Sequence, residues 1–305
     1  MKRITTLLFI LLILCGCTSN SHYLSITNTK EENNELISDI YSYDLNKNSL
    51  SLITSIPYTS NYPLTTYNNN HIYYSARSDT NIEYSPCLIK EYNLDNKEDN
   101  IIADYVDTIN DIRYLDNKLF IVGQLKDLDD HNMVPTIYDL KTKKIEDFNW
   151  DNDQFVCASN YNPDDNSIIL AHYSYKEKES LNNAYNNNEI SFEETIPTIT
   201  ISKIDNNKIS KLYTLNKEVL SIYLNNNKLY YTTDNKLICY NIDNAKKEVI
   251  LEDYNLKIVY ANKKDLYIIN HKDLIKYNFE TKQENTIFTA KNKSAINNIQ
   301  TYQAK

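Results

Sequence analysis

Apolar residues in this sequence gather in runs of about five residues, and clusters of Asn, Asp and Lys separate the runs. The runs are rich in Ile, Leu, Tyr and Thr, residue types that pack well on a pleated sheet. Asn and Asp tolerate the backbone conformations of tight turns. The pattern therefore predicts strand after strand, joined by short turns into consecutive antiparallel hairpins.

Two sequence motifs recur along the chain and show that the hairpins form a regular repeat. The first is a turn followed by an apolar run, and it occurs at 68–75, 116–123, 164–171, 225–232 and 263–270, with a weaker copy at 20–27. The second is an aromatic residue followed by Asn or Asp and an apolar residue, and it begins at Tyr43, Tyr92, Tyr138, Tyr240 and Tyr277, with a degenerate copy at 202–207. Six units of four runs, about 48 residues each, predict an all-β six-bladed β-propeller with four-stranded antiparallel blades.

The two ends of the chain predict how the ring closes. The first unit has runs only at 22–27, 37–44 and 49–55, and so lacks an innermost strand. The chain ends in an unmatched apolar run at 296–302. We expect this C-terminal strand to complete the first blade beside 22–27 or 37–44, which leaves few exposed strand edges. A two-sheet sandwich or an open solenoid would not account for the matched orphan strands.

The N-terminus has the features of an export signal. Met1–Arg3 is basic, and an apolar core of eleven residues follows at 4–14, whereas a helix that spans a bilayer needs about 20 residues. The sequence Leu14-Cys15-Gly16-Cys17 resembles the lipobox of bacterial lipoproteins. The resemblance implies a signal peptide at 1–16 and cleavage before Cys17. It also implies a diacylglyceryl thioether on that cysteine and, in some bacteria, an N-acyl chain such as palmitate. Residues 17–305 would then form a single propeller domain on a short N-terminal tether.

This leader implies an extracytoplasmic protein that is lipid-anchored to the bacterial cell membrane. Two acyl chains give stable attachment where one is marginal. The alternative is an ordinary secretory leader with a chance cysteine. After cleavage, Cys87, Cys157 and Cys239 remain besides Cys17, and an odd count spread over three blades is no disulfide framework.

Charge and glycine content exclude several functions. The formal net charge is −9, which makes nucleic acid an improbable partner. The whole sequence has two glycines, Gly16 and Gly123. Glycine-based phosphate loops and the nucleophile elbow of hydrolases are therefore absent. The five His residues form no close pair, and His71 and His172 are interpreted as structural.

One segment points to a known kind of propeller. Residues 162–174, NPDDNSIILAHYS, resemble the repeat of TolB-like propellers, which reads Ser-Pro-Asp-Gly-Lys before an apolar strand. Asn162 and Asp165 depart from that repeat, and the resemblance covers one blade. It implies the propeller fold and the binding of proteins or small ligands. The peptidase domain that some relatives carry would find no room in this chain.

Long insertions interrupt three adjacent units at 76–86, 123–135 and 172–197. Each joins the second and third strands of its blade, so all three are expected on one face of the ring, and such insertions often form the binding face. They are acidic, whereas the turns of the opposite face are rich in Lys. Variable, solvated loops are the alternative interpretation. The candidate binding residues on this acidic loop face are Asp79, Glu83, Tyr84, Asp107, Asp127, Asp129, Asp130, Tyr175 and Tyr185.

These observations predict a binding or interaction module whose partner is a protein, peptide or glycan at the acidic loop face. No catalytic residue, metal site or cofactor is assigned. The loop at 127–132 is acidic but lacks the glycine and distal Glu of a calcium loop. The alternative is a propeller enzyme, lactonase-like or glycan-processing, that uses carboxylates at the channel mouth. Its best residues flank the inner strands and are Asp107, Asp111, Asp151 and Asp153.

Overall fold

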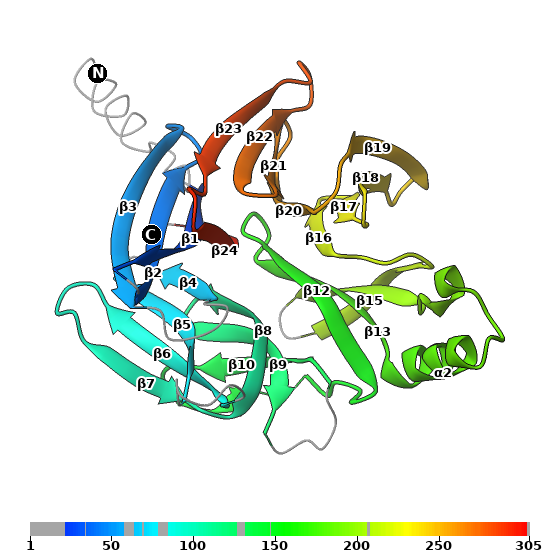
Figure 1. The fold of residues 1–305 in the computed structure, drawn as a ribbon, viewed down its shortest axis with the longest axis horizontal. Coiled ribbons are helices and arrows are strands. Elements are labelled where there is room, and N and C mark those ends of the chain that lie inside the picture. The colour runs from blue at the N-terminus through cyan, green and yellow to red at the C-terminus, as the bar shows by residue number, and fades with distance from the viewer. Residues whose placement is uncertain are drawn as a thin grey trace, which may run out of the picture.

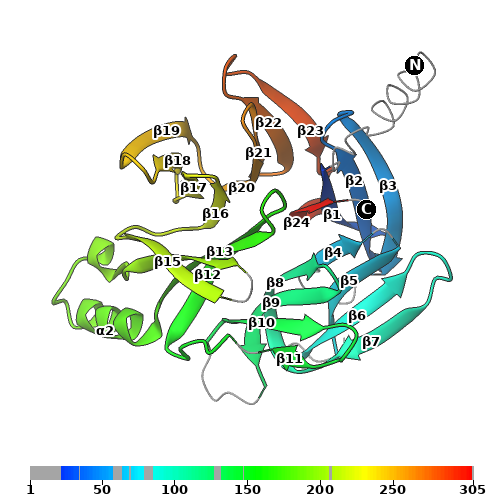
Figure 2. The same cartoon turned by 180° about the vertical axis from the view of Figure 1, so that it is seen from behind.

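In the computed structural model, six four-stranded antiparallel sheets surround a central axis as the blades of a ring (Figures 1 and 2). The structure describes residues 22–33, 35–57, 64–68, 70–78, 85–126, 132–146, 148–205 and 208–303. The predicted six-bladed β-propeller is confirmed.

The blades follow one another around the ring in chain order; in blades 2 to 6 the chain runs from the innermost strand outward, and in blade 1 it enters at the second strand. Blades 1 to 3 comprise β1 (His22–Glu32), β2 (Glu35–Asp44), β3 (Ser49–Pro57), β4 (Thr65–Asn68), β5 (His71–Arg77), β6 (Cys87–Asn93), β7 (Asp99–Ala103), β8 (Val106–Leu115), β9 (Lys118–Leu125), β10 (Val134–Asp139) and β11 (Ile145–Glu146). Blades 4 to 6 comprise β12 (Gln154–Asn162), β13 (Ser167–Ser174), β14 (Ile199–Asp205), β15 (Lys208–Leu215), β16 (Ser221–Asn225), β17 (Lys228–Thr232), β18 (Lys236–Asn241), β19 (Lys246–Glu252), β20 (Leu256–Ala261), β21 (Asp265–Asn270), β22 (Asp273–Asn278) and β23 (Glu284–Thr289).

The last strand closes the ring. β24 (Ser294–Gln303) pairs antiparallel with β1, so that blade 1 has the order β24-β1-β2-β3. Tyr23 lies opposite Tyr302, and their rings stack with centroids 5.2 Å apart. Ile26 lies opposite Ile299, and both are buried in the core. The predicted closure by the C-terminal strand is therefore present, on the 22–27 side.

A shared turn explains the recurring Tyr-Asn/Asp motif. In five blades the Asn or Asp side chain accepts hydrogen bonds from the backbone N–H groups two and three residues further on; the five residues are Asp44, Asn93, Asp139, Asn241 and Asn278. These bonds lower the pKa of Asp44 and Asp139. Eight of the fifteen non-glycine residues with positive φ in the described chain are Asn, the residue type that occupies this region most readily after glycine. The chain thus builds its turns with hardly any glycine.

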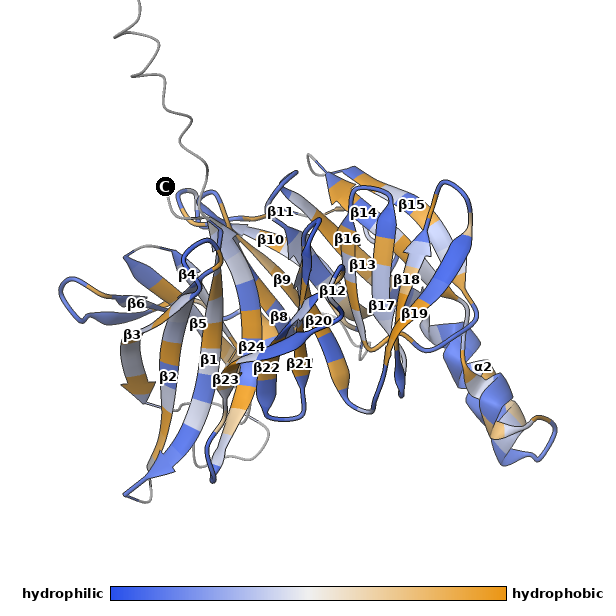
Figure 3. Cartoon of the chain, turned by 90° about the horizontal axis from the view of Figure 1, so that it is seen from above, coloured by the Kyte–Doolittle hydropathy of each residue, from blue (hydrophilic) through white to orange (hydrophobic). Residues whose placement is uncertain are grey.

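Packing between neighbouring blades forms the core. Hydrophobic residues recur along many strands (Figure 3). Middle strands such as β9 and β13 carry long runs of buried residues, because both faces of each sheet pack on a neighbouring sheet. Gly123 marks a close approach, because a Cβ there would lie 2.6 Å from the backbone oxygen of Thr108 on the neighbouring strand. Only glycine fits at this position without displacing β8.

His172 is a buried structural residue of blade 4, as interpreted from the sequence. Its Nδ1 lies 2.8 Å from Gln154 Oε1 and its Nε2 lies 2.9 Å from Ser202 Oγ. The neutral ring can make both bonds, donating through one nitrogen and accepting through the other. Burial, with a smaller contribution from Lys211, lowers the pKa of His172 to about 4.

This lowered pKa predicts acid sensitivity. The unfolded chain, with a His pKa near 6.5, binds the proton more readily than the folded chain, so the stability contributed by neutral His172 is complete above pH 6.5 and is lost towards pH 4. We expect His172→Gln to reduce the loss of unfolding free energy between pH 7 and pH 4.5 by about 2 to 3 kcal/mol. Chemical denaturation at both pH values measures this difference. Equal pH dependence in the variant and the natural protein would contradict it.

Candidate ligand-binding face

The insertion of blade 4 forms a helical arm on the loop face. The connection between β13 and β14 folds into α2 (Tyr175–Asn186) and the short 3-10 helix η1 (Phe192–Thr195). Figure 3 shows α2 projecting away from the ring. None of its residues is buried. In the part of the chain that the structure describes, no helix is long and apolar enough to cross a membrane.

Polar contacts at its base hold the arm in place. Ser174 caps α2 by accepting a hydrogen bond from the Glu177 N–H, and its own hydroxyl donates to Asp153 at 2.6 Å. The bond from Ser174 lowers the pKa of Asp153. Glu177 accepts hydrogen bonds from Thr198 N and Oγ1, both at 3.1 Å. The helix is thus tied to the strand that precedes it and to the segment that follows it.

A groove of about 460 Å³ lies between the arm and the ring, where blades 4 and 5 meet. Its apolar lining includes Tyr185, Phe192, Ile196 and Leu220, which expose 42%, 70%, 37% and 41% of their surface. The rings of Tyr185 and Phe192 meet edge to face with centroids 6.0 Å apart. Together with Tyr175, these are five of the twelve large apolar side chains that the described residues expose. Such a concentration indicates an interaction site.

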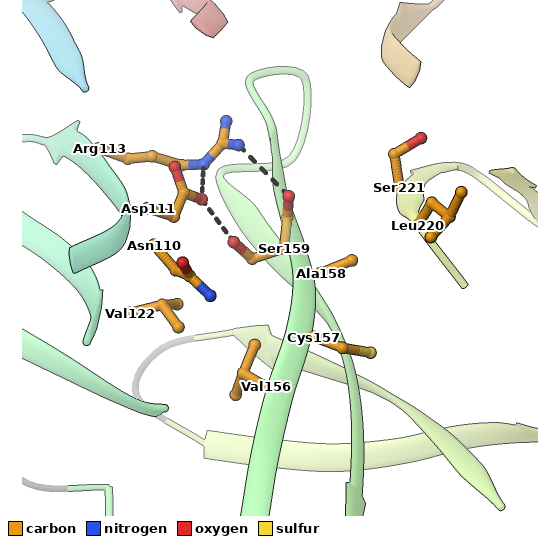
Figure 4. Close-up of a pocket in the computed structure, with 10 residues that line it drawn as sticks. All are labelled: Asn110, Asp111, Arg113, Val122, Val156, Cys157, Ala158, Ser159, Leu220 and Ser221. Atoms are coloured by element: carbon orange, nitrogen blue, oxygen red, sulfur yellow. Dashed lines mark hydrogen bonds and ion pairs between the residues drawn. The ribbon is translucent and has the colours of Figure 1, made fainter. Parts of the chain in front are cut away.

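The polar mouth of the ring lies beside this groove. A pocket of about 290 Å³ opens between β8, β12 and the start of β16 (Figure 4). Asp111 and Arg113 stand two residues apart on β8, and Arg113 Nε donates to Asp111 Oδ2 at 2.6 Å. Ser159 Oγ donates to the same carboxylate oxygen at 2.5 Å. Cys157 and Leu220 line both the pocket and the groove, so the two cavities are neighbours.

Hydrogen bonds that start from residues of this pocket cross the centre of the ring. Gln300 on β24 donates to Asp111 Oδ1 at 3.2 Å and thereby joins blade 1 to blade 3. Asn160 on β12 accepts from Arg113 and donates to the Val259 carbonyl of blade 6 at 3.2 Å. Figure 1 shows the β12–β13 hairpin reaching into the middle of the ring. We call Asp111, Arg113, Ser159, Asn160 and Gln300 the central polar network.

The structure describes only some of the binding residues that the sequence predicts. Tyr175 and Tyr185 lie on α2 and are exposed, and Asp107 is half-buried on β8. Six predicted binding residues and the proposed lipid site lie outside the described residues, namely Asp79, Glu83, Tyr84, Asp127, Asp129, Asp130 and Cys17. Of the predicted residues that the structure describes, Tyr185 alone lines the groove.

The four carboxylates of the enzyme alternative have separate surroundings. Asp111 belongs to the central polar network, Asp153 holds the arm, and Asp151 accepts from the Asp153 N–H at 3.0 Å. Asp107 lies near Cys87. Burial raises the pKa of the Cys87 thiol, and the negative charge of Asp107 raises it further by a smaller amount. Among the described residues, no group of three or more His, Cys, Asp and Glu side chains is placed to hold a metal ion.

Several residues of the face were not singled out from the sequence, among them Arg113 and Glu218. Arg113 could have been found from its spacing, because residues two apart on a strand point to the same side. Glu218 lies in the connection between β15 and β16 and lines the groove. It has no distinguishing sequence context, and only the fold brings it to the arm.

Comparisons with known proteins identify no family. No family model matches the sequence, and a search of curated proteins gives no match. An oligogalacturonate lyase in complex with manganese resembles the structure with 10% identity and a TM-score of 0.47, over 72% of this chain and 62% of that chain. The AtxE2 isopeptidase in its apo form resembles it with 10% identity and a TM-score of 0.45, over 89% of this chain and 50% of that chain. The matches thus span roughly half to three fifths of those proteins, and at this identity function must come from the chain's own site.

Proposed function

We propose that this protein is a lipid-anchored binding module of the bacterial cell surface, and that it binds its partner on the loop face. The observation that carries the proposal is the groove under α2, where exposed aromatic and aliphatic side chains gather on an insertion that the blade itself does not need. Regular blades 5 and 6 make the same connection with a few residues. Exposed apolar surface of this kind is retained when a partner covers it.

The binding proposal is favoured over the enzyme alternative by the state of Asp111. Both of its oxygens accept hydrogen bonds from protein groups, namely Arg113, Ser159 and Gln300. A general base or nucleophile needs an oxygen that can reach the substrate. The carboxylate of Asp111 instead holds three blades together, which is a structural task.

The binding proposal is tested by capture from membranes of the native host. The full chain carrying Phe192→Ala and Leu220→Ala should recover at least tenfold less of the partner than the unchanged chain, because two apolar contacts are lost. Leu52→Ala is the matched control, since Leu52 is 54% exposed on a different blade. Recovery of the same partner in equal amount by the double variant would contradict binding at the groove.

Attachment through Cys17 is a separate prediction. The leader resembles that of lipoproteins, and a lipid on Cys17 would hold the chain at the bilayer. We expect Cys17→Ala to release the mature chain from membranes or to leave the uncleaved precursor. Membrane fractionation and labelling with a fatty-acid analogue measure both outcomes, and Cys15→Ala is the neighbouring control. Unchanged partitioning and lipid labelling in Cys17→Ala would refute the anchor.

A further inference from the structure

We propose that the groove binds a peptide segment in which a large aliphatic or aromatic side chain stands next to a Lys or Arg. The apolar side chain would enter the groove, and the cation would lie beside Glu218. This inference rests on the proposed binding function and specifies the chemistry of the partner.

The groove contains a carboxylate that has no partner among the described residues. Two charged side chains, Lys178 and Glu218, line it. The Lys178 ammonium donates to the Thr195 carbonyl at 2.8 Å and is thereby held against η1. Within the described residues, no cation or hydrogen-bond donor pairs with the exposed Glu218 carboxylate. A ligand with a positive charge would supply the missing partner.

The surroundings strengthen this preference. Between Tyr175 and Thr198 the insertion carries five Glu residues and two Lys residues. Like charges on one surface attract ligands of the opposite sign and repel those of the same sign. An acidic segment would therefore be disfavoured in the groove, which gives selectivity as well as attraction.

The walls favour hydrocarbon over sugar. Ile196, Ile199, Val219 and Leu220 present branched aliphatic surfaces beside the rings of Tyr185 and Phe192. A sugar needs many hydrogen-bond partners, and burying its hydroxyls without them costs free energy. A large aliphatic or aromatic side chain has no hydroxyls to leave without partners, and its removal from water favours binding.

The neighbouring polar mouth suits the backbone of such a segment. Through Cys157 and Leu220 the groove continues into the pocket that Asn110 lines. Asn110 is exposed there, and its side-chain amide can donate to and accept from a peptide group. An apolar groove beside a pocket lined by an amide can receive a side chain and the neighbouring peptide group of one extended segment.

The probes are four fluorescein-labelled peptides of the form Gly-Ser-X-Z-Ser-Gly. X is Leu or Ala, Z is Lys or Glu, and the full chain is titrated in detergent while fluorescence anisotropy is recorded. We expect the Leu-Lys peptide to bind at least tenfold more tightly than either the Leu-Glu or the Ala-Lys peptide. Raising the salt concentration should weaken the Lys preference, since partly exposed charges are screened.

Variants assign the preference to residues. Glu218→Gln should reduce the discrimination between Lys and Glu to about threefold or less, whereas Glu179→Gln, the same change on the neighbouring helix α2, should leave it nearly unchanged. Phe192→Ala should weaken the Leu-Lys peptide about tenfold, and Leu52→Ala should not. Both groove positions are exposed, so a thermal melt like that of the natural chain is expected and shows that folding is unaffected.

Three results with the peptides would overturn the inference. They are equal affinity for all four peptides, a preference for Glu, and an unchanged Lys preference in Glu218→Gln. Binding of cellohexaose without any peptide binding would assign the groove to glycans and would also overturn it. If the membrane capture still depends on Phe192 and Leu220 while the peptides show no preference, the proposed binding function stands and only the peptide chemistry fails.

Discussion

A chain truncated after Lys293 is expected to fail to fold into a stable ring. The deletion removes β24, the innermost strand of blade 1, and with it the whole antiparallel ladder to β1. It also removes Ile299 from the core and Gln300 from the central polar network. Together these losses exceed the net stability of about 5–15 kcal/mol that a domain has available. Far-UV circular dichroism, gel filtration and thermal unfolding measure the outcome.

A shorter truncation provides the control for this experiment. Removal of only Ala304 and Lys305 leaves all of β24 in place, so its melting curve should match that of the full chain. A peptide covering residues 294–303, added to the longer truncation, should restore part of the cooperative transition. A truncated chain that melts within a few degrees of the full one would show that β24 does not close the ring.

Arg113→Met is expected to destabilise the protein by about 3–5 kcal/mol. Arg113 is 7% exposed, and its guanidinium donates hydrogen bonds to Asp111, Asn160 and the Ser159 carbonyl. Its removal leaves the largely buried Asp111 carboxylate without its cation, and an uncompensated buried charge is costly. Urea denaturation at pH 7 measures the change in unfolding free energy.

A surface ion pair is the matched control for Arg113. Lys118 contacts Glu146 at 2.7 Å, with 31% and 36% of the two side chains exposed, so Lys118→Met should cost less than about 1 kcal/mol. Adding Asp111→Asn to Arg113→Met should recover part of the loss, since the orphaned charge is then absent. If the two single Met variants cost the same, the central polar network does not contribute as described.

The blades were predictable because their local chemistry repeats. The Asn or Asp after each aromatic residue closes the same side-chain-capped turn in five blades, as at Asn93 and Asn278. Short apolar runs between such turns leave few alternatives to hairpins. Ring closure was predictable for a different reason, since the unmatched run at 296–302 had only one incomplete unit to join.

The arm and the network were not predictable from the pattern. α2 buries no residue and contains three Asn residues, so it lacks both the apolar stripe and the helix-favouring composition by which helices are recognised. Its start depends on Ser174 and on Asp153, which lies 21 positions earlier in the chain. Asn160 and Gln300 look like ordinary polar residues of strands. Their roles arise only where strands from distant blades meet.

Because the first strand pairs with the last, the first blade stays incomplete until nearly the whole chain has been synthesised. About 260 residues separate β1 from β24, and at about 5–20 residues per second a ribosome needs roughly 15–50 s to synthesise them. Until then one edge of β1, with its apolar residues Leu24 and Ile26, has no neighbour. An open strand edge pairs readily with other chains. The first blade is therefore open to association with other chains until β24 has joined β1.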